Sequence, residues 1–166
     1  MRAWHWIFLL LLVGGLVGCD QVTKGVAESE LRGAGPTSLV SGFLELSYTQ
    51  NRDMAFSLLH PLLGPAARYP LLVLAKILGA SVALTLLIQR RNVATWTERV
   101  GLASIIAGAL GNLVDRVMRG YVVDFIHASY WPVFNVADVA VSVGVGLLLL
   151  SWAWPPQRTS DADTPG

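Results

Sequence analysis

Cysteine, histidine and charge of either sign are all scarce in this sequence of 166 residues. One cysteine excludes an internal disulfide and every cysteine-based metal cluster, and three scattered histidines offer no helical pair that could hold zinc. The 12 basic and 11 acidic residues give a net charge of +1, so no excess of basic residues indicates a nucleic-acid partner. We therefore expect a protein without an internal disulfide, a cysteine- or histidine-pair metal site or a nucleic-acid partner.

Apolar residues, by contrast, are abundant. Hydrophobic residues make up 54% of the chain and charged residues 14%, and the mean hydropathy is +0.55. Soluble domains average about 25% charged residues, and one of this size could not cover so much apolar surface. A disordered chain needs the opposite balance of charge and hydrophobicity. The composition therefore predicts an integral membrane protein.

Four apolar stretches have, or nearly have, the about 20 residues that a membrane-spanning helix needs. They are Trp4–Val22, Tyr69–Ile88, Val100–Val114 and Asp138–Trp154. Lys76 inside the second stretch costs about 2.5–3.5 kcal/mol at mid-membrane, but the surrounding Leu, Ile and Val offset it. We expect Lys76 to snorkel or to face other helices. The arginine-rich loop Gln89–Arg99 indicates the cytoplasmic side, and four spans place both termini there as well.

The loop at about residues 24–68 is the only sizeable segment that we expect outside the membrane. Within it Leu44, Leu46 and Tyr48 alternate with polar residues, which predicts a half-buried strand and a small sheet on the membrane surface. Residues 1–154 would form one membrane domain. The polar, proline-bearing tail at residues 155–166 is predicted to be disordered.

The N-terminus allows a second interpretation. Residues 1–19 read as a secretory signal, and the sequence Leu-Val-Gly-Cys at residues 16–19 resembles the lipobox at which bacterial lipoproteins are cleaved. On this reading the mature protein would begin at a lipidated Cys19. Three further apolar spans oppose it, because most lipoproteins continue into a soluble domain. The simpler reading makes Cys19 a small buried thiol in the first helix.

Charged and amide side chains at membrane depth are costly and by default indicate a functional site. Here they gather at the outer boundary. They are Asp20 and Lys24 at the end of the first span, Asn112, Asp115 and Arg116 near the end of the third, Asp124 after it, and Asn135 and Asp138 at the start of the fourth. A polar network that joins the helices is one explanation. An ion path is disfavoured, because only Lys76 lies deep.

Five motifs carry a family resemblance. In chain order they are Asp-Gln-Val-Thr-Lys at 20–24, Asn-Arg-Asp-Met-Ala-Phe at 51–56, Gly-Ala-Leu-Gly-Asn-Leu-Val-Asp-Arg at 108–116, Val-Val-Asp-Phe at 122–125 and Phe-Asn-Val-Ala-Asp at 134–138. In this order and spacing they resemble lipoprotein signal peptidase (signal peptidase II), a family of membrane aspartyl proteases. Two positions depart from the family pattern. Asp53 stands where the family usually has glycine, and Ala107 where it often does.

The resemblance implies an all-α integral membrane protein with four transmembrane helices and a small periplasmic β-cradle. It implies an endopeptidase of the bacterial inner membrane that cleaves prolipoproteins before their diacylglyceryl-modified cysteine. Its partners would be diacylated prolipoproteins and membrane lipid, and we expect a monomer. By the same resemblance the catalytic pair is Asp124 and Asp138.

The chemistry of the four candidate aspartates favours this pair. An aspartyl protease needs two carboxylates that share one proton, so that one activates water and the other polarises the scissile carbonyl. Two carboxylates about 4 Å apart repel by about 4 kcal/mol at an effective dielectric of 20, which is enough to keep one protonated. Asp124 and Asp138 have no lysine or arginine within four positions, whereas Asp20 has Lys24. Asp115, which precedes an arginine, is the runner-up for one member of the pair.

The resemblance assigns supporting roles to the remaining residues. Asn112 and Asn135 would position the catalytic pair or the substrate backbone, and Arg116 with Asp115 would orient the site. Asn51 and Phe56 would cover the substrate from the outer loop, and Asp20 with Lys24 would fix the first helix against the site. Two alternatives from other classes stay open: a lipoprotein substrate lipidated at Cys19, and a non-enzymatic scaffold in which the carboxylates serve only for packing.

Overall fold

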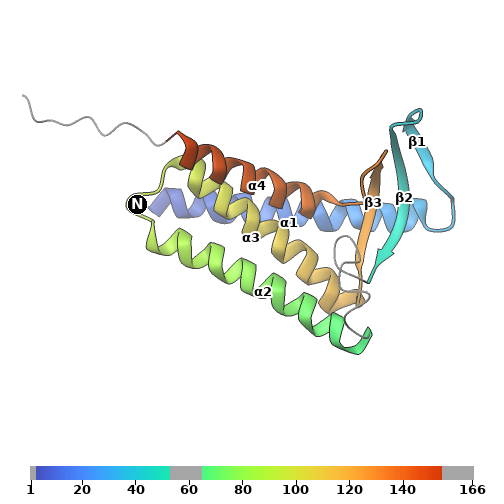
Figure 1. Ribbon diagram of the computed structural model, residues 1–166, viewed down its shortest axis with the longest axis horizontal. Helices are drawn as coiled ribbons and strands as arrows, with labels where there is room; N and C mark the ends of the chain where they lie inside the picture. The colour runs from blue at the N-terminus through green and yellow to red at the C-terminus, as the bar shows by residue number, and fades with distance from the viewer. Residues whose placement is uncertain (1–2, 53–64, 155–166) are drawn as a thin grey trace, which may run out of the picture.

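Our computed structural model describes residues 3–52 and 65–154. Its elements are the helices α1 (Ala3–Leu31), α2 (Pro65–Gln89), α3 (Trp96–Arg119) and α4 (Val136–Ala153) and the strands β1 (Thr37–Val40), β2 (Leu44–Asn51) and β3 (Val122–Ala128). The helices run along one another, and the strands lie across one end of them (Figure 1). Three sequence predictions lie outside the described residues: those for Asp53 and Phe56 and for the tail at 155–166.

Each predicted span is helical, and within the described residues three helices are long and apolar enough to cross a membrane. These are α1, α3 and α4, and the described part of α2 adds the apolar stretch Val73–Gln89. Large apolar side chains face outward on the bundle, among them Leu11, Leu74 and Leu149, each more than half exposed. Such an apolar outer surface fits lipid better than water.

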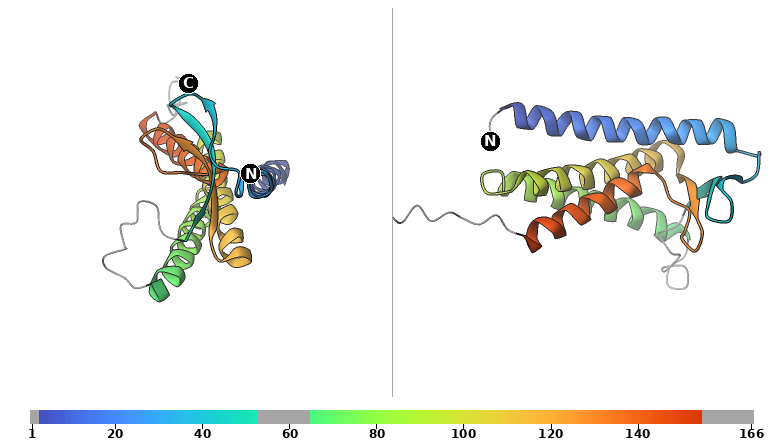
Figure 2. Two further views of the ribbon diagram at one scale, coloured as in Figure 1. Left: turned by 90° about the vertical axis from the view of Figure 1, so that its right-hand side faces the viewer. Right: turned by 90° about the horizontal axis from the view of Figure 1, so that it is seen from above.

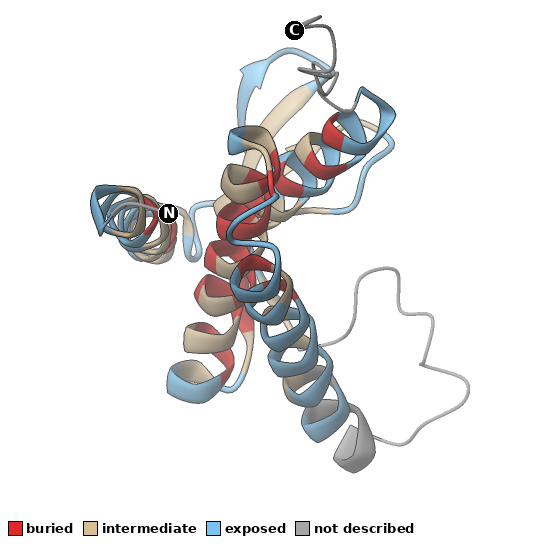
Figure 3. Cartoon of the chain, turned by 90° about the vertical axis from the view of Figure 1, so that its left-hand side faces the viewer, coloured by how far each residue is buried: buried red, intermediate tan, exposed pale blue. Residues whose placement is uncertain are grey.

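The third helix is the centre of the bundle. α3 packs against α1, α2 and α4, and Figure 3 shows the buried residues gathered in the middle of the molecule. Small residues allow the helices to approach closely. A side chain at Gly108 would collide with the carbonyl oxygen of Ala137 and with Val141 in α4. The contact between α3 and α4 therefore fixes the start of α4 against α3.

The three strands form one antiparallel sheet in the order β1-β2-β3. β2 confirms the strand predicted at Leu44–Tyr48 and continues it to Asn51. The sheet lies at the end of the bundle opposite the beginning of α1, as Figure 1 and the right view of Figure 2 show. Thr49 pairs with Asp124 and Asn51 with Val122, so the end of β2 lies beside β3.

The first helix is longer than the predicted span, which ended at Val22. α1 continues to Leu31, and its inner face buries Asp20, Lys24 and Ala27. Glu28 on this extension accepts hydrogen bonds from the hydroxyls of Tyr48 and Tyr121, and so ties α1 to the sheet. The expectation of a buried thiol is wrong, because Cys19 is exposed on α1.

Candidate active site

Asp124 is placed by the strand that follows α3. Gly120 ends α3 with φ 77°, a left-handed conformation that glycine adopts without strain, and the chain turns from there into β3. The first four residues of β3 are all buried, because β3 lies between β2 and the helices α1 and α3. They are Val122, Val123, Asp124 and Phe125. The strand thus carries the Asp124 carboxylate to the end of the bundle.

Asp138 is placed by the cap of α4. Asn135 is the N-cap residue, and its side chain accepts a hydrogen bond from the backbone N–H of Asp138 at 3.0 Å. In return Oδ2 of Asp138 accepts from the backbone N–H of Asn135 at 3.3 Å, which completes a capping box. Phe134 pairs with Ile126 of β3, and this bridge holds the cap beside Asp124.

Asn135 joins the two carboxylates. Its Nδ2 donates to Oδ1 of Asp124 at 2.6 Å, while its backbone and its Oδ1 bind Asp138. The other oxygen of Asp124, Oδ2, accepts from Nδ2 of Asn51 at 2.7 Å. Asn112 donates from Nδ2 to Oδ1 of Asp138 at 2.9 Å. Three amides therefore hold both carboxylates in fixed orientations.

Behind these amides lies a buried cation, Lys24, which is fully shielded from solvent. Its Nζ lies 2.8 Å from Oδ2 of Asp20 and 3.0 Å from Oδ2 of Asp115, and donates to Oδ1 of Asn112 at 3.0 Å. Asp20 also accepts from the backbone N–H of Ala137 at 2.8 Å, at the start of α4. The predicted contact of Asp20 with Lys24 is confirmed, and the pair holds α1 against α3 and α4.

Asp115 has cationic partners other than its neighbour in sequence. The described ion pairs of Asp115 are with Lys24 and with Arg119, one turn further along α3. Its Oδ2 also accepts from the backbone N–H of Val123 in β3 at 3.1 Å. Arg116 donates to the carbonyl oxygen of Asn112 instead, at 3.3 Å. Asp115 thus links β3 to α1 and α3 through one buried carboxylate.

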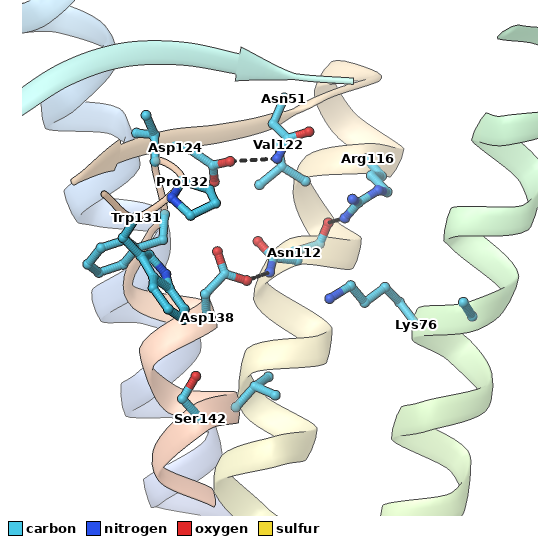
Figure 4. A pocket seen from close by; sticks show the side chains of 14 residues that line it. Asn51, Lys76, Asn112, Arg116, Val122, Asp124, Trp131, Pro132, Asp138 and Ser142 are labelled. Carbon is cyan, nitrogen blue, oxygen red and sulfur yellow. Dashed lines mark hydrogen bonds between the residues drawn. The ribbon is translucent and has the colours of Figure 1, made fainter. Parts of the chain in front are cut away.

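A cavity of about 360 Å³ opens in front of the two carboxylates. Its polar lining consists of Asn51, Lys76, Asn112, Arg116, Asp124, Asp138 and Ser142. Its apolar lining includes Val122, Trp131, Pro132 and Val141. Figure 4 shows Asp124 above Asp138 on one side of this space and Lys76 reaching into it from α2. Neither Asp20 nor Asp115 is among the residues that line the cavity.

Burial raises the pKa of the Asp124 carboxyl from 3.8 to about 6. The hydrogen bond from Asn51 counteracts this rise, the negative charge of Asp138 adds to it, and the hydrogen bond from Asn135 counteracts it again. A carboxyl with such a pKa exchanges protons near neutral pH, as a general acid or base must. The described residues contain no group of three or more His, Cys, Asp and Glu side chains that could hold a metal ion.

Eight of the predicted site residues form one connected network, and Arg116 is bound to its backbone. The eight are Asp20, Lys24, Asn51, Asn112, Asp115, Asp124, Asn135 and Asp138. Sequence reasoning missed Arg119, although its spacing of one turn from Asp115 was a signal. It also left Lys76 and Trp131 out of the site. A lysine in the middle of an apolar span was a signal for the first, and nothing in the sequence indicated the second.

Known proteins resemble the chain over nearly its whole length. A family model for signal peptidase (SPase) II matches residues 9–154. A lipoprotein signal peptidase of Teredinibacter turnerae is 39% identical over 150 residues, which cover 88% of this chain and 84% of that protein. One of Halothermothrix orenii is 33% identical over 155 residues, covering 93% and 99%. A bacterial membrane enzyme solved by the in meso method at 2.3 Å resolution has a similar fold, with a TM-score of 0.78, 24% identity and 95% and 94% of the two chains covered.

Proposed function

Because the chain belongs to the signal peptidase II family and is therefore a membrane protease, we propose that it removes signal peptides from prolipoproteins by an aspartyl mechanism. In this proposal it cleaves the peptide bond before the diacylglyceryl-modified cysteine. Asp124 and Asp138 are its two catalytic residues, and no metal or cofactor takes part.

The observation that supports this proposal best is that the four aspartates of the site have two different kinds of partner. Asp124 and Asp138 line one cavity and are bound by neutral amides, and neither forms an ion pair with another described residue. Asp20 and Asp115 face the ammonium of Lys24 and lie outside the cavity lining. A nearby cation stabilises both carboxylates as ions, whereas an uncompensated pair keeps one proton between them. Only Asp124 and Asp138 are therefore suited to acid–base exchange.

The reaction follows from this shared proton. The ionised carboxylate takes a proton from water, and the resulting hydroxide equivalent attacks the scissile carbonyl carbon. The protonated carboxyl donates its hydrogen bond to the carbonyl oxygen and stabilises the tetrahedral intermediate. The proton taken from water then passes to the leaving nitrogen as the carbon–nitrogen bond breaks. Asn135 and Asn112 keep the two carboxylates in place through both steps.

The proposal places all four helices across the bacterial inner membrane, with the sheet and the cavity at the periplasmic face. At the end of the bundle away from the sheet, Arg90 and Arg91 lie in the connection from α2 to α3, and Arg99 lies in the first turn of α3. These arginines favour the cytoplasm for that end of the bundle and for both termini. The chain would act as a monomer. The acyl chains of the substrate would stay in the lipid and hold the modified cysteine at the depth of Asp124 and Asp138.

Cleavage of a synthetic diacylated prolipoprotein peptide by the purified chain in lipid vesicles tests this function. We expect a product whose mass shows an N-terminal lipid-modified cysteine, formed equally fast with and without a metal chelator. A matched peptide without the lipid should be cleaved at least a hundredfold more slowly, because it loses the membrane anchoring that positions the scissile bond. Equal rates on the two peptides, or loss of activity with the chelator, would contradict the proposal.

A further inference from the structure

Among the described residues of α2, Ala75 and Lys76 line the cavity, and of these two only Lys76 carries a charge. It reaches from α2 toward Asn112 and Asp138 on the opposite wall (Figure 4). Around it α2 is apolar over Val73–Gln89. A lysine in such a stretch disfavours membrane insertion, which indicates a function that needs its positive charge.

The two lysines of the chain differ in their surroundings. The Lys24 ammonium is saturated by Asp20, Asp115 and Asn112. Lys76, by contrast, makes no hydrogen bond and no ion pair with any other described residue, although the charge of Asp138 acts on it through space. An ammonium group has three N–H donors. Lys76 reaches into the cavity toward Asp138, and no described residue occupies its donors (Figure 4).

We propose that Lys76 is a substrate-binding residue whose ammonium donates a hydrogen bond to a carbonyl oxygen of the lipid-modified cysteine. This inference rests on the proposed function. Two parts of such a substrate carry this chemistry: the esters that join the acyl chains to glycerol, and the peptide carbonyls beside the scissile bond.

The depth of Lys76 favours the esters. The cavity extends from Asp138 along α4 to Ser142, one helical turn further from the sheet, and Ala75 and Lys76 line it from α2. The esters of a diacylglyceryl cysteine lie between the peptide and the acyl chains. With the scissile bond at Asp124 and Asp138, the esters reach this inner part of the cavity. A charged donor there would select ester-linked lipid over a purely apolar chain.

Steady-state cleavage by the full-length enzyme in lipid vesicles tests the proposal, with Lys76→Met, Lys76→Arg and a control, Leu78→Met. Leu78 lies on the same helix and is 61% exposed on the outer surface. Each variant is assayed on two peptides of one sequence, one with ester-linked and one with ether-linked chains. The parent should prefer the ester substrate. Lys76→Met should raise KM for the ester-linked substrate about tenfold with kcat nearly unchanged, and should lose the preference for this substrate. Lys76→Arg should keep most of the preference, and Leu78→Met should keep all of it.

Each other outcome has a definite meaning. A KM that rises equally on both substrates would retain Lys76 as a substrate-binding residue and assign it to a peptide carbonyl. A fall in kcat with a displaced pH profile would overturn the proposal, because Lys76 would then act on the two carboxylates. Unchanged kinetics, or a lower melting temperature that accounts for the loss, would overturn it too. Failure of the parent to cleave either peptide would instead contradict the proposed function.

Discussion

Replacing Asn51 by alanine is expected to move the pH range of cleavage upward. Nδ2 of Asn51 donates to Oδ2 of Asp124 at 2.7 Å, and this bond is the strongest of the influences that hold the pKa of Asp124 down against burial. The two carboxylates must carry one proton between them to act. Any change that makes ionisation harder displaces both of their titrations to higher pH, whichever carboxylate holds the proton at rest.

The size of the displacement follows from the strength of the lost bond. A hydrogen bond to a charged group contributes about 1.5–3 kcal/mol, and Asn51 is only half-buried, which favours the lower value. One pKa unit corresponds to about 1.4 kcal/mol. The pKa of Asp124, about 6 in the parent, should therefore rise by about one unit. Because Asp124 then keeps the shared proton to higher pH, the alkaline limb of the cleavage profile should move up by about one pH unit, and the fraction of enzyme that carries this proton at pH 8 should rise about ninefold.

The assay is kcat/KM for a diacylated peptide between pH 5 and pH 9, with Gln50→Ala as the matched control. Gln50 precedes Asn51 on β2 and donates to the hydroxyl of Tyr48, away from the two carboxylates. Gln50→Ala should leave the pH dependence of kcat/KM unchanged. An Asn51→Ala profile that is lowered equally at every pH, or displaced toward acid, would refute the reasoning, since Asn51 would then not act through the charge of Asp124.

Three further substitutions test the support of the site. Asp115→Asn should lower the stability by about 3 kcal/mol, measured by thermal unfolding, because it breaks a fully buried pair with Lys24; an unchanged melting temperature with lost activity would instead return Asp115 to the catalytic pair. Gly108→Ala should cost at least about 1 kcal/mol and most of the activity, because its methyl group would collide with α4, whereas Gly79→Ala, with open space around it, should do neither. Cys19→Ser should insert, fold and cleave like the parent, since the thiol is exposed on α1; a mature chain that begins at a lipidated Cys19 would contradict this expectation.

Hydropathy and motif spacing predicted the helices and most of the site because both depend on local sequence. Each apolar run became a helix, and the motifs placed Asp124, Asn135 and Asp138 at positions that the structure brings together. The alternation at Leu44–Tyr48 predicted β2, in which Leu46 and Tyr48 pack against a buried apolar cluster.

The missed elements depend on contacts that are distant in sequence. β3 shows no alternation, because Val122 to Phe125 are all buried, and so the sequence pattern did not predict this strand. β1 is short and exposed throughout, so it gave no pattern either. The end of α1 was placed too early because Lys24 reads as the edge of a membrane span. Only the folded chain supplies Asp115 and Asn112, which allow Lys24 to be buried inside the bundle.

The central claim, that Asp124 and Asp138 together activate water, is tested most directly by measuring cleavage of the diacylated peptide by Asp124→Asn and Asp138→Asn. The matched control is Glu45→Gln, which removes a partly exposed carboxylate on β2. We expect each aspartate variant to insert and melt like a folded protein while its kcat falls below a few per cent of the parent, because each change removes one role of a two-carboxylate reaction. Glu45→Gln should cleave like the parent. A folded Asp124→Asn or Asp138→Asn enzyme that retains more activity than this would contradict the account.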